Sequence, residues 1–318
     1  MYSRRDFGKT MIGGASLAAL PASKLWGMSP DAVYKGVKLG AITGSLGQAT
    51  AAPGQDVVDA IIQQCIAAKV GTVELVNTPL EPRVTGGGIG GQVPATVTPA
   101  YQKSRDELRD WRINGSLDRF KEIRKKFDTA GLDLYSFVMT IGDDFTEPEI
   151  EAVFKQMEAL GVGRFCTNQT RVSAGPRMAP YAEKYKIIAA WHTHAMVNNP
   201  NEVASPESLA KVLAMSKYFM VNLDIGHFAD GGNDPMKYFM EHHDRITHLH
   251  VKDVKVIGGG GAAELGEGVL GISDMLKTVR DKHYPIAFIL ERNFTTPGSS
   301  AVEETRRQIE WMERVLDS

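Results

Sequence analysis

The sequence predicts a single (β/α)8 barrel, and three observations support this fold class. Short runs of β-branched and apolar residues alternate along the chain with longer stretches whose apolar residues recur at three- and four-residue spacing. No G-x-G-x-x-G turn follows the first such run, as it would in a doubly wound dinucleotide-binding sheet. A chain of 318 residues also has the length for one barrel, which typically needs about 250 residues.

Eight segments have the composition and length of buried strands. They are Val37 to Ile42, Thr72 to Val76, Leu132 to Met139, Arg164 to Thr167, Ile187 to Thr193, Phe219 to Ile225, Ile246 to Val251 and Ile286 to Leu290. Eight strands with helices between them, in a barrel domain covering residues 29–318, fit a closed parallel barrel.

Amphipathic patterns between the strands predict the helices. The clearest are Val57 to Ala68, Leu117 to Ala130, Glu147 to Leu160, Pro206 to Met215, Pro235 to His243 and Ser300 to Leu316. Ser205-Pro206 and Asp234-Pro235 each place a capping side chain before a proline at the first helical position, so two of these helices have defined starts.

Composition excludes several classes of partner. Lys and Arg number 36 against 38 Asp and Glu, a net charge of −2, which offers no basic surface for nucleic acid or for an anionic membrane. The two cysteines, Cys65 and Cys166, are too few for a disulfide framework, and we expect both to be buried as small apolar residues.

The first 28 residues have the layout of an export signal. Arg4 and Arg5 precede Phe7 and Lys9, and a short, weakly apolar run follows, as in the twin-arginine signals of bacteria. This run is too short to span a bilayer, which takes about 20 apolar residues. We therefore expect an exported, periplasmic protein whose signal covers residues 1–28.

Residues 79–115 interrupt the alternation after the second strand. This insertion contains the glycine run 86–91 and a charged run around Arg105 to Arg112. A loop after a barrel strand lies at the carboxyl end of the strands, where barrel enzymes have their active sites. The insertion is therefore either a flexible lid or an inert or oligomer-forming segment. A second glycine run, 258–261, follows the seventh strand on the same face, either as a substrate contact or as a solvated hinge.

Histidines and carboxylates collect where four successive strands end. His192 and His194 end the fifth strand, Asp224 and then His227 end the sixth, His248, His250 and Lys252 alternate along the seventh, and Glu291 ends the eighth. Strand ends at one rim of a barrel bring such side chains together, and two imidazoles with two carboxylates suit a divalent ion such as Zn²⁺, Mn²⁺, Co²⁺ or Fe²⁺. His242, His243 and His283 fall on helices or helix ends, and we expect them to be solvated.

The motifs Leu223-Asp224-Ile225-Gly226-His227, Thr247 to Asp253, Leu265-Gly266-Glu267-Gly268 and Leu290-Glu291-Arg292 resemble those of the sugar phosphate isomerase/epimerase superfamily, the xylose isomerase-like TIM barrels. The resemblance covers about residues 37 to 315. It implies metal ligation by Asp224, His250 and Glu291, with His227 beside the substrate.

The fourth ligand position departs from this resemblance. Epimerases of the superfamily have a glutamate at the end of the fifth strand, where this chain has His192. A metal-bound imidazole has no lone pair left to act as a base, so a proton relay between two carboxylates is incomplete. Either His194 or Lys252 supplies the missing base, or the reaction needs only one proton abstraction.

We therefore expect an enzyme with one divalent metal ion that abstracts a proton next to a carbonyl of a carbohydrate. Glu291, His194 or Lys252 is the candidate base, and His227, Glu74, Asn168 and His248 are candidate substrate-binding residues. Isomerisation or epimerisation through an enediolate is one outcome. Another is β-elimination from a keto-sugar or 3-keto-glycoside by a dehydratase or lyase. A third reading is a non-catalytic periplasmic sugar-binding barrel. The sequence leaves open whether the chain forms a homo-oligomer.

Overall fold

The computed structural model describes residues 30–49, 51–87, 93–167, 171–292 and 294–318. Eight parallel strands close into a barrel, because β2 pairs with both β3 and β11, while the short strand β1 (Val33–Tyr34) adds antiparallel to β2. The barrel strands are β2 (Val37–Ile42), β3 (Thr72–Val76), β4 (Asp133–Val138), β5 (Arg164–Thr167), β6 (Ile188–His192), β7 (Phe219–Asp224), β8 (Ile246–Val251) and β11 (Ala287–Leu290). All eight predicted strands are thereby confirmed.

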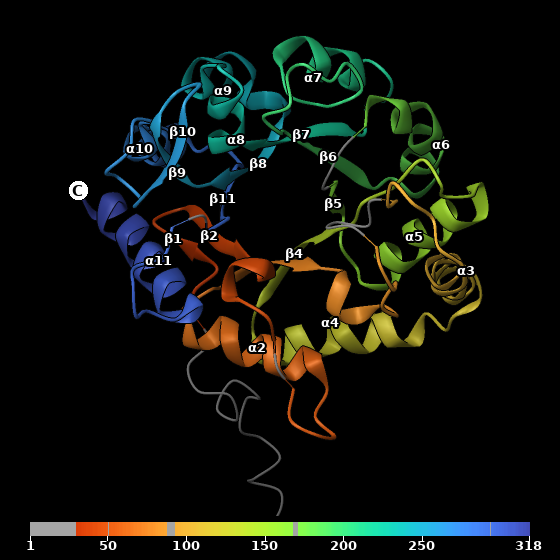
Figure 1. Ribbon diagram of the computed structural model, residues 1–318. Coiled ribbons are helices and arrows are strands. Elements are labelled where there is room, and N and C mark those ends of the chain that lie inside the picture. The colour runs from red at the N-terminus through yellow and green to blue at the C-terminus, as the bar shows by residue number, and fades with distance from the viewer. Residues whose placement is uncertain (1–29, 50, 88–92, 168–170, 293) are drawn as a thin grey trace, which may run out of the picture.

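Helices surround the strands, as Figure 1 shows. They are α2 (Val57–Ala67), α3 (Pro99–Asn114), α4 (Asp118–Ala130), α5 (Glu147–Ala159), α6 (Gly175–Tyr185), α7 (Pro206–Leu213), α8 (Ile225–Asp230), α9 (Pro235–His242), α10 (Ile272–Lys282) and α11 (Ala301–Asp317). The predicted caps are present: the side chains of Ser205 and Asp234 accept the backbone N–H groups of Ser208 and Lys237.

Two hydrophobic clusters hold the barrel together. The larger one lies between the strands and the surrounding helices and includes Trp191. A smaller one contains side chains from strands on opposite sides of the barrel, β2, β4, β5 and β11, and so fills the barrel interior. Cys166 belongs to this inner cluster and Cys65 to the outer one; both are buried and unpaired, as predicted.

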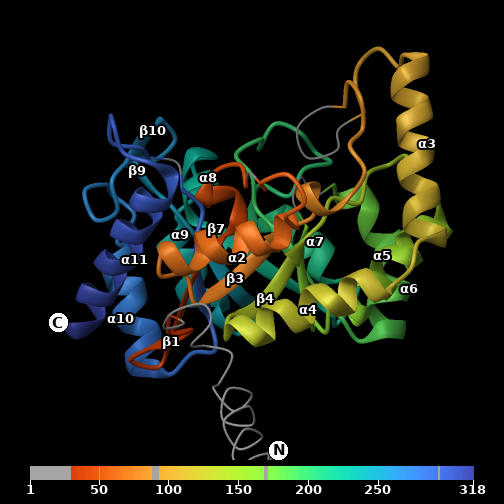
Figure 2. The same ribbon diagram turned by 90° about the horizontal axis from the view of Figure 1, so that it is seen from below.

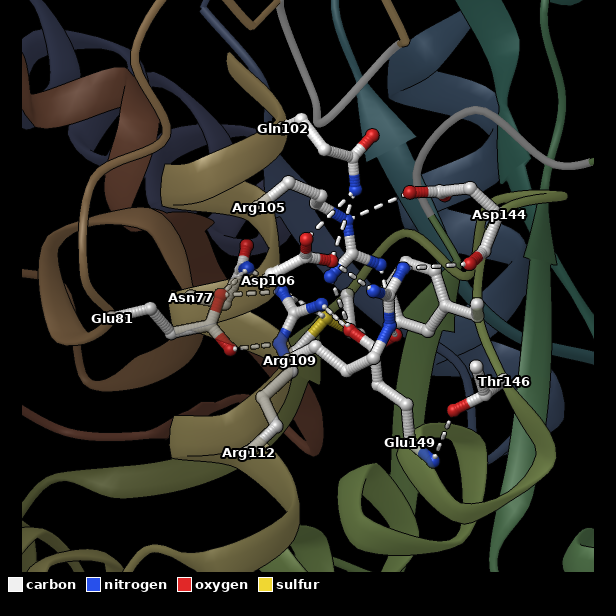
Figure 3. Close-up of polar contacts among 12 residues, drawn as sticks. Asn77, Glu81, Gln102, Arg105, Asp106, Arg109, Arg112, Asp144, Thr146 and Glu149 are labelled. Carbon is white, nitrogen blue, oxygen red and sulfur yellow. Dashed lines mark hydrogen bonds and ion pairs between the residues drawn. The ribbon is translucent and has the colours of Figure 1, made fainter. Parts of the chain in front are cut away.

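The helical part of the insertion is fixed to the barrel. Arg105, Arg109 and Arg112 recur at three- and four-residue spacing on one face of α3 and meet Glu149 of α5 (Figure 3). Arg105 and Arg112 each lie 2.8 Å from the Glu149 carboxylate, and Arg112 also pairs with Glu81 at 2.8 Å. This buried network docks α3 on α5 and so favours a fixed position for residues 99–114 over a lid that moves as a whole.

The second glycine run lies in a hairpin made by β9 (Asp253–Val256) and β10 (Gly260–Ala263), which the sequence analysis missed. The Asp253 carboxylate fixes the segment after this hairpin by accepting the backbone N–H groups of Gly266, Gly268 and Leu270. Figure 2 shows the hairpin and α3 at the same end of the barrel, opposite β1. Both additions therefore flank the rim at which the strands end.

Substituting Glu149→Ala should lower the free energy of unfolding by about 3–5 kcal/mol, because it leaves three arginines around an uncompensated buried position. Urea denaturation measures the loss. Glu158→Ala is the matched control, since Glu158 is an exposed carboxylate on the same helix and should change stability by no more than about 0.5 kcal/mol. A loss for Glu149→Ala no larger than that of the control would contradict the docking role of the network.

Candidate metal centre

Four neighbouring strands bring two imidazoles and two carboxylates to one rim of the barrel. β6 and β7 end at His192 and Asp224, β8 carries His250 opposite Asp224 in the strand register, and Glu291 directly follows β11. One nitrogen or oxygen from each residue lies within 4.8 Å of those of the others. The structure thus brings together the four predicted ligands as an N₂O₂ donor set of the kind that divalent transition ions accept.

The two oxygens of Asp224 have different partners. Oδ1 accepts the backbone N–H of His227 at 2.7 Å and so caps the short helix α8. Oδ2 is fully buried and faces the centre of the group, 3.8 Å from His192 Nε2 and 4.0 Å from His250 Nδ1. A buried carboxylate oxygen directed at two ring nitrogens fits a metal ligand, so the donor set matches the ion that the sequence predicts.

His192 is suited to ligation because burial keeps it neutral. Its side chain is 3% exposed, and burial, helped by the neighbouring His250 and His194, lowers its pKa well below the usual value. A neutral imidazole keeps a lone pair for a metal ion. Its Nδ1 lies 3.3 Å from the Asn222 amide, which leaves Nε2 facing Asp224.

His250 lies between two carboxylates. Its Nδ1 is 2.7 Å from Glu291 Oε2, and its Nε2 is 2.5 Å from Glu74 Oε1. Burial alone would lower the pKa of His250, but Glu74 and Glu291 outweigh it and raise the pKa to about 10. Without a metal ion, His250 is therefore an imidazolium. An ion at Nδ1 would replace one of its protons, as is usual when a histidine becomes a ligand.

Glu291 is the most open member of the group, with its side chain 31% exposed. Ser45 fixes the backbone on either side of it: the Ser45 hydroxyl donates to the carbonyl of Leu290 and accepts the N–H of Arg292. Burial would raise the pKa of Glu291, but Lys252 and His250 hold it well below its usual range.

Lys252 occupies the space between two of the predicted ligands. Its Nζ lies 2.8 Å from Asp224 Oδ2 and 3.2 Å from Glu291 Oε1. Burial would lower the pKa of Lys252, yet the two carboxylates raise it. Because the side chain is then an ammonium at neutral pH, its position argues against the predicted role as a base and suits a proton donor.

His194 lies at the edge of the group, with its ring centroid 4.9 Å from that of His192 and 5.6 Å from that of His227. Its Nδ1 forms a short hydrogen bond with the buried carboxylate of Glu202. The sequence analysis missed Glu202, because it lies in the loop before α7, outside any strand end. In a neutral ring, a carboxylate at Nδ1 selects the tautomer in which Nε2 carries no proton.

Two of the predicted substrate-binding residues lie deeper in the barrel. Glu74 and His248 are fully buried, and His248 Nε2 lies 3.0 Å from Glu74 Oε2. His248 Nδ1 lies 2.8 Å from the Thr247 hydroxyl. Side chains at this depth do not reach a substrate that enters from the rim, so the position of both argues against direct substrate contact. Asn168 lies outside the described residues, while His227 remains at the rim.

The comparisons with known proteins agree with the fold. Residues 172–315 match the model of the xylose isomerase-like TIM barrel family. This matched segment contains all four predicted ligands, His194 and Lys252. Together with the closed eight-stranded barrel, the match shows that the fold is a xylose isomerase-like TIM barrel. No curated protein matches the chain.

Several solved structures with this fold match the chain at low sequence identity. A probable 3-DHS dehydratase from Bacillus anthracis is 14% identical, with 86% of this chain and 97% of that one covered and a TM-score of 0.57. A sugar phosphate isomerase/epimerase from Parabacteroides distasonis is 17% identical, with coverage of 87% and 94% and a TM-score of 0.54. A xylose isomerase-like TIM barrel protein from Mycobacterium smegmatis, solved in complex with magnesium, is 13% identical, with coverage of 88% and 96% and a TM-score of 0.55.

A search of the described helices for a membrane span found none with the required length and apolarity.

Removing a ligand should remove the metal ion. Purified Asp224→Ala and His250→Ala variants are expected to lose stoichiometric metal in elemental analysis, because each leaves three ligands and an unbalanced charge. His242→Ala changes an exposed histidine on α9 and should retain the wild-type metal content. Full metal content in both ligand variants would show that the ion is bound elsewhere.

Proposed function

We propose that this chain is an exported, divalent-metal-dependent enzyme that abstracts a proton next to a carbonyl group of a carbohydrate. The observation that carries the proposal is the convergence of His192, Asp224, His250 and Glu291 beside a third histidine, His194, which is hydrogen-bonded to Glu202. The isomerase/epimerase and dehydratase among its structural neighbours are consistent with this chemistry. A bound divalent ion would polarise the substrate oxygens and stabilise the negative charge formed as the proton leaves, which is worth several kcal/mol of barrier.

His194 is the base in this proposal. Glu202 holds Nδ1, so Nε2 keeps its lone pair, in the same way as a carboxylate orients the histidine of a hydrolase triad. Glu291 is less suited to the role, because Lys252 and His250 already neutralise it. His227, whose ring lies 5.6 Å from that of His194, lies where it would contact the substrate.

Lys252 is the acid. Its ammonium is held at the rim by Asp224 and Glu291, within reach of an oxygen that binds beside these carboxylates. In an isomerisation it would donate a proton to the carbonyl oxygen. In an elimination it would protonate the departing oxygen as the carbon–oxygen bond breaks and a carbon–carbon double bond forms.

One observation favours β-elimination as the second candidate function. Epimerisation requires proton transfer on both faces of a planar intermediate, and the strand position that would carry the second carboxylate holds the buried imidazole of His192. A single base together with an ammonium as the acid is sufficient to eliminate water or an aglycone from a keto-sugar or 3-keto-glycoside. Isomerisation and elimination differ in their products, since only elimination releases a leaving group.

Incubating the metal-loaded chain in D₂O with ketoses, aldoses and 3-keto-glucosides tests the proposal. We expect NMR to show deuterium entering at the carbon next to the carbonyl, or an unsaturated product. His194→Gln should slow the reaction by about 10²–10⁴-fold, the usual contribution of a general base. His242→Ala serves as the control and should leave the rate unchanged. Ligand binding that survives chelation, with no exchange or product from any sugar, would instead indicate a binding protein.

Export rests on residues 1–28, which lie outside the described residues. We propose that the chain crosses the membrane by the twin-arginine route, which carries folded proteins and so suits an enzyme that has acquired its ion in the cytoplasm. Changing Arg4 and Arg5 to lysine should keep the precursor in the cytoplasmic fraction of a bacterial host. Periplasmic appearance of this double variant at the wild-type level would contradict the assignment.

A further inference from the structure

The carboxylate of Glu74 is fully buried, and among the described residues it contacts the metal group through His250. Glu74 Oε1 lies 2.5 Å from His250 Nε2. The other ring nitrogen, Nδ1, faces Glu291 Oε2 at 2.7 Å and Asp224 Oδ2 at 4.0 Å. The two nitrogens of His250 therefore face different groups: Nδ1 faces the predicted ligands, and Nε2 faces Glu74.

Two further side chains contact the Glu74 carboxylate. The Ser136 hydroxyl, opposite Glu74 in the pairing of β3 with β4, donates to Oε2, and His248 Nε2 lies 3.0 Å from the same oxygen. Among the described residues, the ion-pair contacts of Glu74 are with imidazoles alone. Burying a carboxylate without a lysine or arginine partner costs free energy, and the hydrogen bonds of Glu74 with Ser136 and His250 offset that cost here.

We infer that Glu74 is a positioning residue that holds His250 with its proton on Nε2 and its Nδ1 lone pair directed at the ion. Histidine ligands commonly donate their second ring N–H to a carboxylate, which fixes the ring orientation and makes the ligating nitrogen more basic. This inference rests on the metal site of the proposed function and not on the reaction. It also explains a buried glutamate that the sequence analysis assigned to the substrate.

The alternative to a positioning role is that Glu74 belongs to a second metal site. A second group of side chains also has ligand atoms within 4.8 Å of one another: Glu74, Cys166, His248 and His250. This group would be able to hold an ion of its own. In the arrangement that we infer, Glu74 is an acceptor of hydrogen bonds, and the protein binds one ion through His250 Nδ1. With a second ion, Glu74 would be a ligand and Cys166 would be required.

Titrating the full metal-free chain with Co²⁺, followed by the visible absorption of the bound ion, separates these cases. Glu74→Gln should weaken Co²⁺ binding about 10–100-fold, the usual cost of losing such a partner, with one ion still bound per chain. Glu304→Gln is the matched control, because Glu304 is an equally buried glutamate whose partners are Thr296 and Arg307. It should bind Co²⁺ as tightly as the wild type.

A second readout does not depend on the variant folding. In long-range ¹H–¹⁵N spectra of the Zn²⁺-loaded wild type, His250 should be bound through Nδ1 and protonated at Nε2. Binding through Nε2, unchanged Co²⁺ affinity in Glu74→Gln, or two bound ions of which Cys166→Ser loses one would each overturn the inference. If the wild type binds no Co²⁺, Mn²⁺ or Zn²⁺ at all, the proposed function fails as well; if it binds normally and only the Glu74 results differ, the inference alone fails.

Discussion

The structure depends on a concentration of buried negative charge at the carboxyl end of the barrel. Glu74 and Asp224 are fully buried and Glu291 is largely covered. Among the described residues, the compensating charges in contact with them are Lys252 and His250. Carboxylates crowded in a low-dielectric interior repel one another strongly unless cations lie between them. In the metal-free chain Lys252 and a protonated His250 supply that charge. A divalent ion would take over part of this role, so metal binding would be coupled to the folding of the rim.

Several features of the fold together place the residues of this site. Parallel strands bring their last residues to one rim, the register sets Asp224 opposite His250, and capping of α8 uses one oxygen of Asp224 while leaving the other for the centre. The structures added at the same end have fixed positions, because α3 is docked through Glu149 and the hairpin segment is held by Asp253. Three of the four predicted ligands therefore lie on strands and Glu291 directly follows one, which suits a site whose ligands must converge on one atom.

The strands and the metal ligands can both be predicted from the sequence, and for the same physical reason. Buried parallel strands are short apolar runs, so a histidine or carboxylate at the end of one stands out, as His192, Asp224 and Glu291 do. Other features depend on contacts between distant segments. Glu202 looks like an ordinary loop residue until His194 is seen beside it, and Glu74 is 176 positions from the histidine that it contacts. The charged run at Arg105 to Arg112 is visible in the sequence, but its docking role requires Glu149 of another helix. Spacing predicts which residues share a rim and does not say how deep each one lies, which is why Glu74 and His248 were assigned to the substrate.

The most direct test of this account is anomalous diffraction from crystals of the full chain grown with Co²⁺. The account predicts one strong peak per chain, bonded to His192, Asp224, His250 Nδ1 and Glu291, with Lys252 displaced from at least one carboxylate. A peak centred among Glu74, Cys166 and His248, or no peak at the rim with Lys252 still between Asp224 and Glu291, would contradict it.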